Sequence, residues 1–183
     1  VANYNQNVKK AHPLLGLKFK NTSGAHLNQG PITVFEGSVY AGDTRVLDVN
    51  LDEERLVSYA IDLGTEVDPQ FKDEENLLKV KFYKGTIIQE FMRKEKKTYK
   101  IVNRSEHART LLIEHPIRPQ FNLITPAKPK EQARNAYRFE VACESKKPTE
   151  LLVEEHLPRQ SQITFSNSSD EAGFFTHLTL PTI

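Results

Sequence analysis

Apolar and polar residues alternate along most of this chain, in short runs separated by turn residues. Two runs rich in Ile, Thr, Val, Phe and Tyr, at 32–36 and 39–41, flank a Gly-Ser pair at 37–38. These apolar types favour a pleated, half-buried surface, whereas the Gly-Pro before the runs and the Gly-Asp after them favour turns. The pattern predicts a β-hairpin within 29–43, and the rest of the chain repeats the same alternation.

Further strands follow from the same pattern. Leu15, Leu17 and Phe19 alternate with Gly and Lys, which is typical of a strand with one buried face. A second hairpin is expected where the run at 78–83 turns at Lys84-Gly85 and returns over 86–92. Two more strand pairs are expected, 99–102 with 110–114 and 137–143 with 149–155, together with strands at 45–48 and 55–62.

Three polar segments are expected to lie outside these strands. Residues 1–13 are rich in Asn and end in His-Pro, which predicts a lead-in that joins the fold near Leu14. Residues 68–76 are expected to form an exposed loop or one helical turn. The charged pentapeptide at 93–97 is expected to be a hairpin tip or the junction between two lobes.

Short strands at intervals of roughly 8–12 residues, without a helical period, predict an all-β fold. We expect two consecutive immunoglobulin-like β-sandwich lobes of short antiparallel strands, at 14–95 and 98–166. Their predicted core positions are Leu15, Leu17, Phe19, Val34, Leu56, Val80, Phe82, Ile101, Leu112, Tyr137, Phe139 and Val141.

Composition narrows the class of protein. The 183 residues are enough to bury a core without metals or disulfides, and the single cysteine excludes an internal disulfide. No apolar run approaches the roughly 18 residues that cross a bilayer, so we expect no membrane span. The net charge of +1 gives no general attraction to nucleic acid.

The two ends of the sequence suggest a piece of a longer protein. The chain opens on Val-Ala-Asn without an initiator Met. We expect 167–183 to be a non-native or disordered tail. Residues 174–183 resemble the peptide produced when a sequencing-library adapter is translated, so we expect the natural protein to continue past about Gly173 with different residues. Reading the frame from an independent clone tests this, because the same residues followed by a stop codon would contradict it.

Two histidines share a context, since His115 and His156 each follow a glutamate near a strand end. Two imidazoles and a carboxylate from neighbouring strands are a zinc-type ligand set. Adjacent residues on a strand point to opposite faces, however, so an adjoining Glu and His are poorly placed to hold one ion. We therefore predict no metal site and no cofactor.

The other reactive side chains are expected to have structural roles. Cys143 shares a strand face with Tyr137, Phe139 and Val141, which predicts a buried, inert thiol. Asp62 at a strand end is expected to cap a turn rather than to act as an acid. The chain has no Gly-x-Ser-x-Gly, Gly-rich phosphate loop or His-Glu-x-x-His motif, so we predict no catalytic residues.

A basic cluster is predicted to be a solvated hairpin that discourages edge pairing, rather than a phosphate-binding site, because Glu95 interrupts it and aromatic residues are not interleaved. Its members are Arg93, Lys94, Lys96, Lys97 and Lys100. Asn-x-Ser sequons begin at Asn21, Asn103 and Asn167, and they matter only in a eukaryotic secretory setting.

Five segments in order carry a family resemblance: Gln-Gly-Pro-Ile-Thr-Val-Phe at 29–35, Tyr-Ala-Gly-Asp at 40–43, Glu-Glu-Arg-Leu-Val-Ser-Tyr-Ala-Ile-Asp at 53–62, Thr-Tyr-Lys-Ile-Val-Asn-Arg at 98–104 and Leu-Ile-Glu-His-Pro at 112–116. Together they resemble the C-terminal β domain of mucoidy-inhibitor-A-like bacterial proteins, over about residues 14–165. Ala60 stands where that family usually has Gly, and Asp52-Glu-Glu replaces its Pro-Gly-Glu turn. The resemblance implies an envelope-associated or secreted β domain of uncharacterised role, and it carries over no site residues.

Two classes of function are therefore considered. The favoured one is a non-enzymatic, structural or protein-binding module of a bacterial envelope-associated protein, which binds another protein or an envelope polymer through sheet edges or loops. The alternative is a carbohydrate-binding or glycan-active accessory domain, with an acid-base pair drawn from Asp62, Glu114 and Glu155. The absence of Trp disfavours a sugar cleft.

Overall fold

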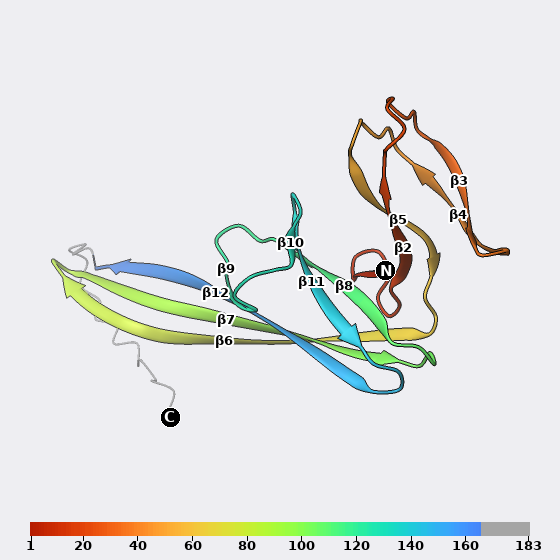
Figure 1. Cartoon of the computed structure of the whole chain (residues 1–183). Coiled ribbons are helices and arrows are strands. Elements are labelled where there is room, and N and C mark those ends of the chain that lie inside the picture. Colours follow the sequence, from red (N-terminus) through yellow and green to blue (C-terminus); the bar gives the residue numbers. More distant parts are fainter. Residues whose placement is uncertain (166–183) are drawn as a thin grey trace.

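The computed structural model describes residues 1–165, which form twelve β-strands and no helix (Figure 1). The all-β class predicted from the sequence is thus confirmed. The strands are β1 Ala2–Asn5, β2 Leu14–Lys20, β3 Gly30–Glu36, β4 Val39–Val46, β5 Glu54–Ile61, β6 Thr65–Tyr83, β7 Thr86–Asn103, β8 Arg109–Pro116, β9 Asn122–Thr125, β10 Glu131–Gln132, β11 Ala136–Cys143 and β12 Pro148–Thr164.

The strands form three sheets. One sheet has six strands in the order β10-β11-β8-β1-β2-β5, and a second has four in the order β6-β7-β12-β9. The hairpin β3-β4 forms a two-stranded sheet of its own. All pairs are antiparallel except β1 with β8, which run parallel.

The main core lies between the six-stranded and four-stranded sheets. Alternate residues of β8 and β11 face inward and meet the inward residues of β7 and β12, so this part of the molecule is packed like a β-sandwich. Its buried members are Ala2, Tyr4, Val67, Tyr99, Ile101, Leu111, Ile113, Phe139, Val141, Cys143 and Val153.

A second, smaller core holds the hairpin β3-β4 against β2 and β5. Val46, Val49 and Val57 are buried there, with Leu17, Phe19, Leu27 and Ile32 packed around them. Gly42 is required at its position, because a Cβ atom there would lie 2.4 Å from the carbonyl oxygen of Tyr59. The hairpin thus approaches β5 closely enough that only glycine fits.

Three strands extend beyond the main core. β6, β7 and β12 have 19, 18 and 17 residues, respectively, and run together as a ribbon away from the six-stranded sheet (Figure 1). We call residues 75–93 and 157–164 the arm. The expectation of uniformly short strands was therefore wrong for these three.

Local turn signals located the hairpins correctly. β3 and β4 meet across Gly37-Ser38, and β6 and β7 meet across Lys84-Gly85, as predicted. The strands at 14–20 and 54–61 were also expected and pair with each other. In each case the signal lies in consecutive residues, where turn chemistry is encoded.

Longer-range pairings were predicted wrongly. Strand β7 pairs with β6 and β12 rather than with β8, and β11 pairs with β8 and β10 rather than with β12. The chain crosses between sheets at 104–108 and 144–147, where a hairpin return was expected. A polar turn looks the same in sequence whether the next strand joins the same sheet or the facing one.

The polar segments were also misassigned. Residues 68–76 belong to β6 instead of forming a loop, and 93–97 lie in the middle of β7 instead of at a hairpin tip. Residues 2–5 form β1, which sits between β8 and β2, so the chain joins the fold before Leu14. Val80 and Phe82 are exposed on the arm rather than buried, because no second sheet covers that region within residues 1–165.

Candidate functional site

A cluster of buried polar side chains closes the main core at the base of the arm. His115 of β8 contacts Glu155 of β12 across the two sheets, with Nε2 3.1 Å from the Glu155 carboxylate. The other ring nitrogen, Nδ1, lies 2.8 Å from the hydroxyl of Tyr99. Arg118, in the segment after β8, donates to both Glu155 and Glu95.

Opposite charges meet in this cluster. The side chains of Glu95 and Glu155 are only 4% and 3% exposed, and both are bound to the Arg118 guanidinium. Burial alone would raise the pKa of Glu155, but hydrogen bonds and charge from His115 and Arg118 outweigh it and lower the pKa. Burial likewise opposes the charge of Arg118, whereas the two carboxylates raise its pKa overall.

Phe121 and Lys97 complete the surroundings of the cluster. The guanidinium of Arg118 lies 3.8 Å from the centre of the Phe121 ring, a cation–π contact that fixes the arginine from the outer side. Burial lowers the pKa of Lys97, and the nearby Arg118 adds to that effect. Burial, followed by the proximity of Tyr4 and Glu155, raises the pKa of Tyr99, so its phenol stays neutral.

The cluster also lines a small cavity. A cavity of about 100 Å³ adjoins the cluster and is lined in part by Phe71 and Pro116. Both nitrogens of His115 are engaged in hydrogen bonds, and the residue is only 3% exposed. The cluster pairs buried charges near the end of β8.

The two histidines singled out in the sequence do not meet. His115 faces the core, whereas His156 lies next to Glu155 on β12, projects to the opposite face and contacts Glu154 at 2.7 Å. Among residues 1–165, no group of three or more His, Cys, Asp or Glu side chains is arranged to hold a metal ion. The carboxylate beside His115 in space is Glu155, forty residues away, and not its sequence neighbour.

The three carboxylates considered for glycan chemistry have separate partners. Asp62 accepts hydrogen bonds from the backbone of Gly64 and the hydroxyl of Thr65, so it caps a turn as predicted. Glu114 is bound by Arg138 and Asn5. Because Glu114 precedes His115 on β8, it points away from the face where Glu155 lies.

The remaining sequence candidates also have structural surroundings. Cys143 is buried, as predicted, and burial raises the pKa of its thiol. The basic cluster divides between the two faces of β7, with Arg93 and Lys97 on one and Lys94, Lys96 and Lys100 on the other. β7 is the central strand of the arm, so the interpretation of these residues as a hairpin that protects an edge was wrong.

Two Asn-x-Ser motifs form the same turn around a buried asparagine. The Nδ2 group of Asn21 donates to the carbonyl of Ala25, and that of Asn103 donates to the carbonyl of His107, each four residues ahead. In both motifs the asparagine Oδ1 accepts from the backbone and hydroxyl of the serine two residues on. The amide nitrogen that would carry a glycan is therefore used inside the fold at both sites. The sequon at Asn167 lies outside the described residues.

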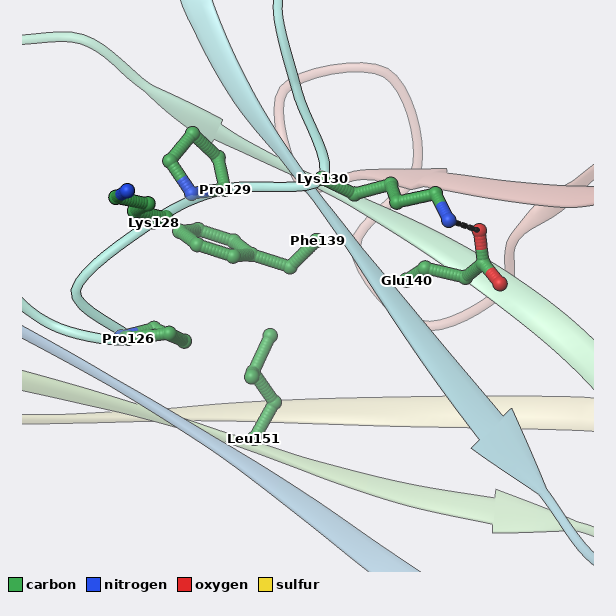
Figure 2. Close-up of a pocket in the computed structure, with 7 residues that line it drawn as sticks. All are labelled: Pro126, Lys128, Pro129, Lys130, Phe139, Glu140 and Leu151. Atoms are coloured by element: carbon green, nitrogen blue, oxygen red, sulfur yellow. Dashed lines mark ion pairs between the residues drawn. The ribbon is translucent and has the colours of Figure 1, made fainter.

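A shallow depression lies between the loop after β9 and the strands β11 and β12 (Figure 2). It encloses about 390 Å³ over Phe139, Leu151, Pro126 and Pro129. Lys130 pairs with Glu140 at 3.7 Å at one side. Its polar groups are exposed lysines and a surface carboxylate, so the depression offers no buried donor or acceptor that would orient a ligand.

Several exposed apolar side chains lie on one face of the arm. Residues directly opposite each other in the register share a face, so Phe82, Ile87 and Ile163 form one row across the three strands. Val80 lies in the next row, and Leu77 with Phe91 in the third. We call this surface the arm face; Phe82, Val80, Leu77 and Ile163 are 75%, 45%, 50% and 46% exposed.

The arm face is a continuation of the core-facing side of the sheet. Following the same register toward the base of the arm leads to Glu95 and Glu155, then to Tyr99 and Ile101 in the core. The alternation of apolar residues was recognised in the sequence, but Val80 and Phe82 were predicted to be buried in a core. An apolar strand face has the same sequence pattern whether or not another sheet covers it.

Charged residues at the inner end of the arm face pair with one another. Arg93 contacts Asp73 at 2.8 Å, and Arg159 contacts Glu75 at 3.2 Å. Arg93 also lies 3.0 Å from Glu95. The arm face therefore combines apolar side chains with the polar Gln89 and Ser161, and its Arg159 is paired with Glu75.

Comparison of the chain with protein-family models, curated proteins and solved structures found no match. Within residues 1–165 no helix is long and apolar enough to cross a membrane.

Proposed function

We propose that this protein is a non-enzymatic, structural or protein-binding module and that the arm is its binding element. The observation that carries the proposal is the row of large exposed apolar residues on the arm face, led by Phe82 at 75% exposure. Large contiguous apolar patches are uncommon on the surface of soluble proteins, and they often mark interaction sites.

The arm also supports binding through its backbone. Within the described residues β6 pairs with no strand other than β7, and its outer edge is bonded to residues 11–12 only at its base, at Thr65 and Val67. The outer edge of β12 is covered by β9 only around 154–156. Open edges accept an added strand, and alternate side chains then contribute specificity. The charged residues of β6, among them Lys72 and Glu74, oppose indiscriminate pairing.

An immunoglobulin-like, two-lobed organisation at 14–95 and 98–166 is part of the proposal. Two separate hydrophobic cores support a division into two lobes, although Val67 and β1 belong to the main core. The matching Asn21 and Asn103 turns support a related build. β7 runs without a break through 95–98, so the proposed boundary between the lobes falls inside one continuous strand. The expected envelope location and bacterial family stay predictions drawn from the sequence.

Site-specific photo-crosslinking tests the binding role. A photoreactive amino acid is placed at position 82, on the arm face, or at position 83, which is exposed on the opposite face. Illumination in the native cells is expected to give a protein adduct from position 82 and little from position 83. Adducts are identified by mass spectrometry.

Binding to and cleavage of a panel of polysaccharides test the alternative, carbohydrate-directed function. Absence of protein adducts at position 82, combined with retention or cleavage of an envelope glycan, would overturn the binding-module proposal in favour of the carbohydrate alternative. Equal adducts at 82 and 83 would show that the arm face has no special role.

A further inference from the structure

We propose that Lys97 is a site of covalent capture for small, uncharged aldehydes, which its amine binds as an imine. This inference goes beyond the proposed binding role and does not depend on it, because Lys97 lies at the base of the arm and not on the arm face. It is supported by the cavity beside Lys97, by the absence of an ion pair at its amine and by the charge of its neighbours.

Lys97 lines the cavity of about 100 Å³ that adjoins the buried cluster. Phe71 of β6 and Val153 of β12 lie directly opposite Lys97 in the register, so the three side chains share one face of the sheet. Pro116, at the end of β8, lines the cavity from the facing sheet. Phe71 is 59% exposed, so its wall of the cavity lies at the surface, within reach of a small molecule.

The amine of Lys97 has no counterion of its own. The two carboxylates that line the cavity, Glu95 and Glu155, are both bound to Arg118, and within residues 1–165 no carboxylate forms an ion pair with Lys97. The amine instead lies 5.4 Å from the centre of the Tyr99 ring. This cation–π contact holds the side chain in the cavity without occupying a hydrogen bond of the amine.

Two effects favour the neutral amine of Lys97 over the charged ammonium. Burial penalises the charged form, and the nearby guanidinium of Arg118 repels it. Both effects lower the pKa of Lys97, with burial the larger, and they outweigh the opposing attraction of Glu155. More of Lys97 than of an exposed lysine is therefore present as the neutral amine, which is the form that attacks a carbonyl carbon.

Imine formation at Lys97 is balanced without an oxidant or a reductant. The nitrogen lone pair attacks the carbonyl carbon and gives a carbinolamine, which then loses water to form a carbon–nitrogen double bond. Both protons of the neutral amine leave with the aldehyde oxygen as that water. The protonated imine carries the same positive charge as the ammonium, so the attraction of Glu155 is retained.

The walls of the cavity indicate the class of aldehyde. Phe71, Pro116 and Val153 offer apolar contacts to a short aliphatic chain, whereas the carboxylates of Glu95 and Glu155 repel an anionic one. The volume of about 100 Å³ is well below that of ordinary ligand pockets, so it limits the ligand to a few non-hydrogen atoms.

Reductive alkylation of the full chain with propionaldehyde and sodium cyanoborohydride near neutral pH tests the site. The hydride reduces the imine to a stable secondary amine, and tandem mass spectrometry gives the initial rate at each lysine. Lys97 is expected to be alkylated about fivefold or more faster than Lys100, which is exposed on the opposite face of the same strand. Exposure alone predicts the opposite order, because Lys97 is partly buried.

Two changes of condition and one pair of variants separate the cavity from other causes. The rate ratio of Lys97 to Lys100 is expected to fall to about one or below in guanidinium chloride, and also near pH 10.4, where an ordinary lysine is half neutral. Phe71→Ala admits water to the cavity and is expected to lower the ratio at least about twofold. Tyr83→Ala is the matched control, because Tyr83 is a similarly exposed aromatic residue of β6 at the far end of the arm, and it is expected to leave the ratio unchanged.

A rate at Lys97 no higher than that at Lys100 near neutral pH would overturn the proposal, as would an excess that persists in guanidinium chloride. Glyoxylate, a small anionic aldehyde, tests the class of ligand. Its rate ratio of Lys97 to Lys100 is expected to be lower than that of propionaldehyde, and an equal or higher ratio would overturn the assignment to uncharged aldehydes.

Discussion

Arg118 is the residue on which the buried cluster depends, because it binds two glutamates that have almost no access to water. We predict that Arg118→Met lowers the free energy of unfolding by about 3 kcal/mol, since removing one partner leaves buried charge uncompensated. Urea unfolding followed by circular dichroism measures this.

Arg104→Met provides the control for Arg118. The Arg104–Glu66 pair is exposed at both ends, so its loss is expected to cost less than about 1 kcal/mol. Adding Glu95→Gln and Glu155→Gln to Arg118→Met is expected to restore part of the loss. An Arg118→Met effect no larger than that of Arg104→Met would show that the glutamates find other partners.

The same cluster predicts a pH dependence of stability. The pKa of folded Glu155 is lowered relative to the unfolded chain, where glutamate titrates at about 4.3. Its contribution is therefore fully present above that value and is lost as the pH falls through the folded pKa. Glu155→Gln is expected to flatten the fall in stability below about pH 4.3. Unfolding free energies at pH 7, 4 and 3 test this, and parallel curves for variant and wild type would contradict it.

At the residue scale, the sequence correctly predicts features that depend only on the alternation of residues within one strand or on the turn next to it. The buried Cys143 and the turn-capping Asp62 follow from parity and from turn chemistry. The contact of His115 with Glu155 does not, because β8 and β12 lie in different sheets and forty residues separate the two side chains. The sequence correctly indicated that Glu114 and His115 point to opposite faces of the strand, which excluded a contact between them. It did not indicate that Glu155 is the actual partner of His115.

At the scale of the element, the arm is predicted to exchange its amide protons unevenly. β7 is paired on both sides, whereas β6 is paired only with β7 among the described residues. We predict slow exchange for β7 over 97–103, where the second sheet covers it, and progressively faster exchange toward 86–90. Alternate amides of β6 are expected to exchange fastest, because edge strands leave half of them unpaired.

Hydrogen–deuterium exchange with mass spectrometry measures this gradient. Uniform protection along β7 would contradict it and would require another segment over the arm.

The structure of the arm explains why the strands at its base were predicted as a loop and a hairpin tip. Residues 68–76 and 93–97 are charged, and charged runs favour loops or tips in a domain whose strands have a covered face. In a ribbon with exposed surroundings, cross-strand pairs such as Arg93–Asp73 stabilise the strands instead. The hairpin tip at Lys84-Gly85 was found because its signal is local.

At the scale of the whole molecule, β1 connects the two cores. It pairs with β8 on one side and β2 on the other, and without it the six-stranded sheet would divide into β10-β11-β8 and β2-β5. Tyr4 anchors this strand: it is fully buried, its hydroxyl donates to the carbonyl of Lys10 at 2.7 Å, and its ring meets that of Tyr99 edge-on. A four-residue polar segment carries no sequence signal for such a role.

Deleting residues 1–6 is therefore predicted to uncouple the cores. The small core around Val49 and Val57 is expected to unfold at a lower temperature than the main core, which gives two calorimetric transitions in place of one. Tyr4→Ala is expected to cost about 3–5 kcal/mol, as for other buried aromatic truncations, whereas Tyr4→Phe costs about 1 kcal/mol because only the hydroxyl bond is lost. A single transition at an unchanged temperature after the deletion would mean that contacts other than β1, such as the backbone bond from Val67 to Ala11, are sufficient to hold the molecule together.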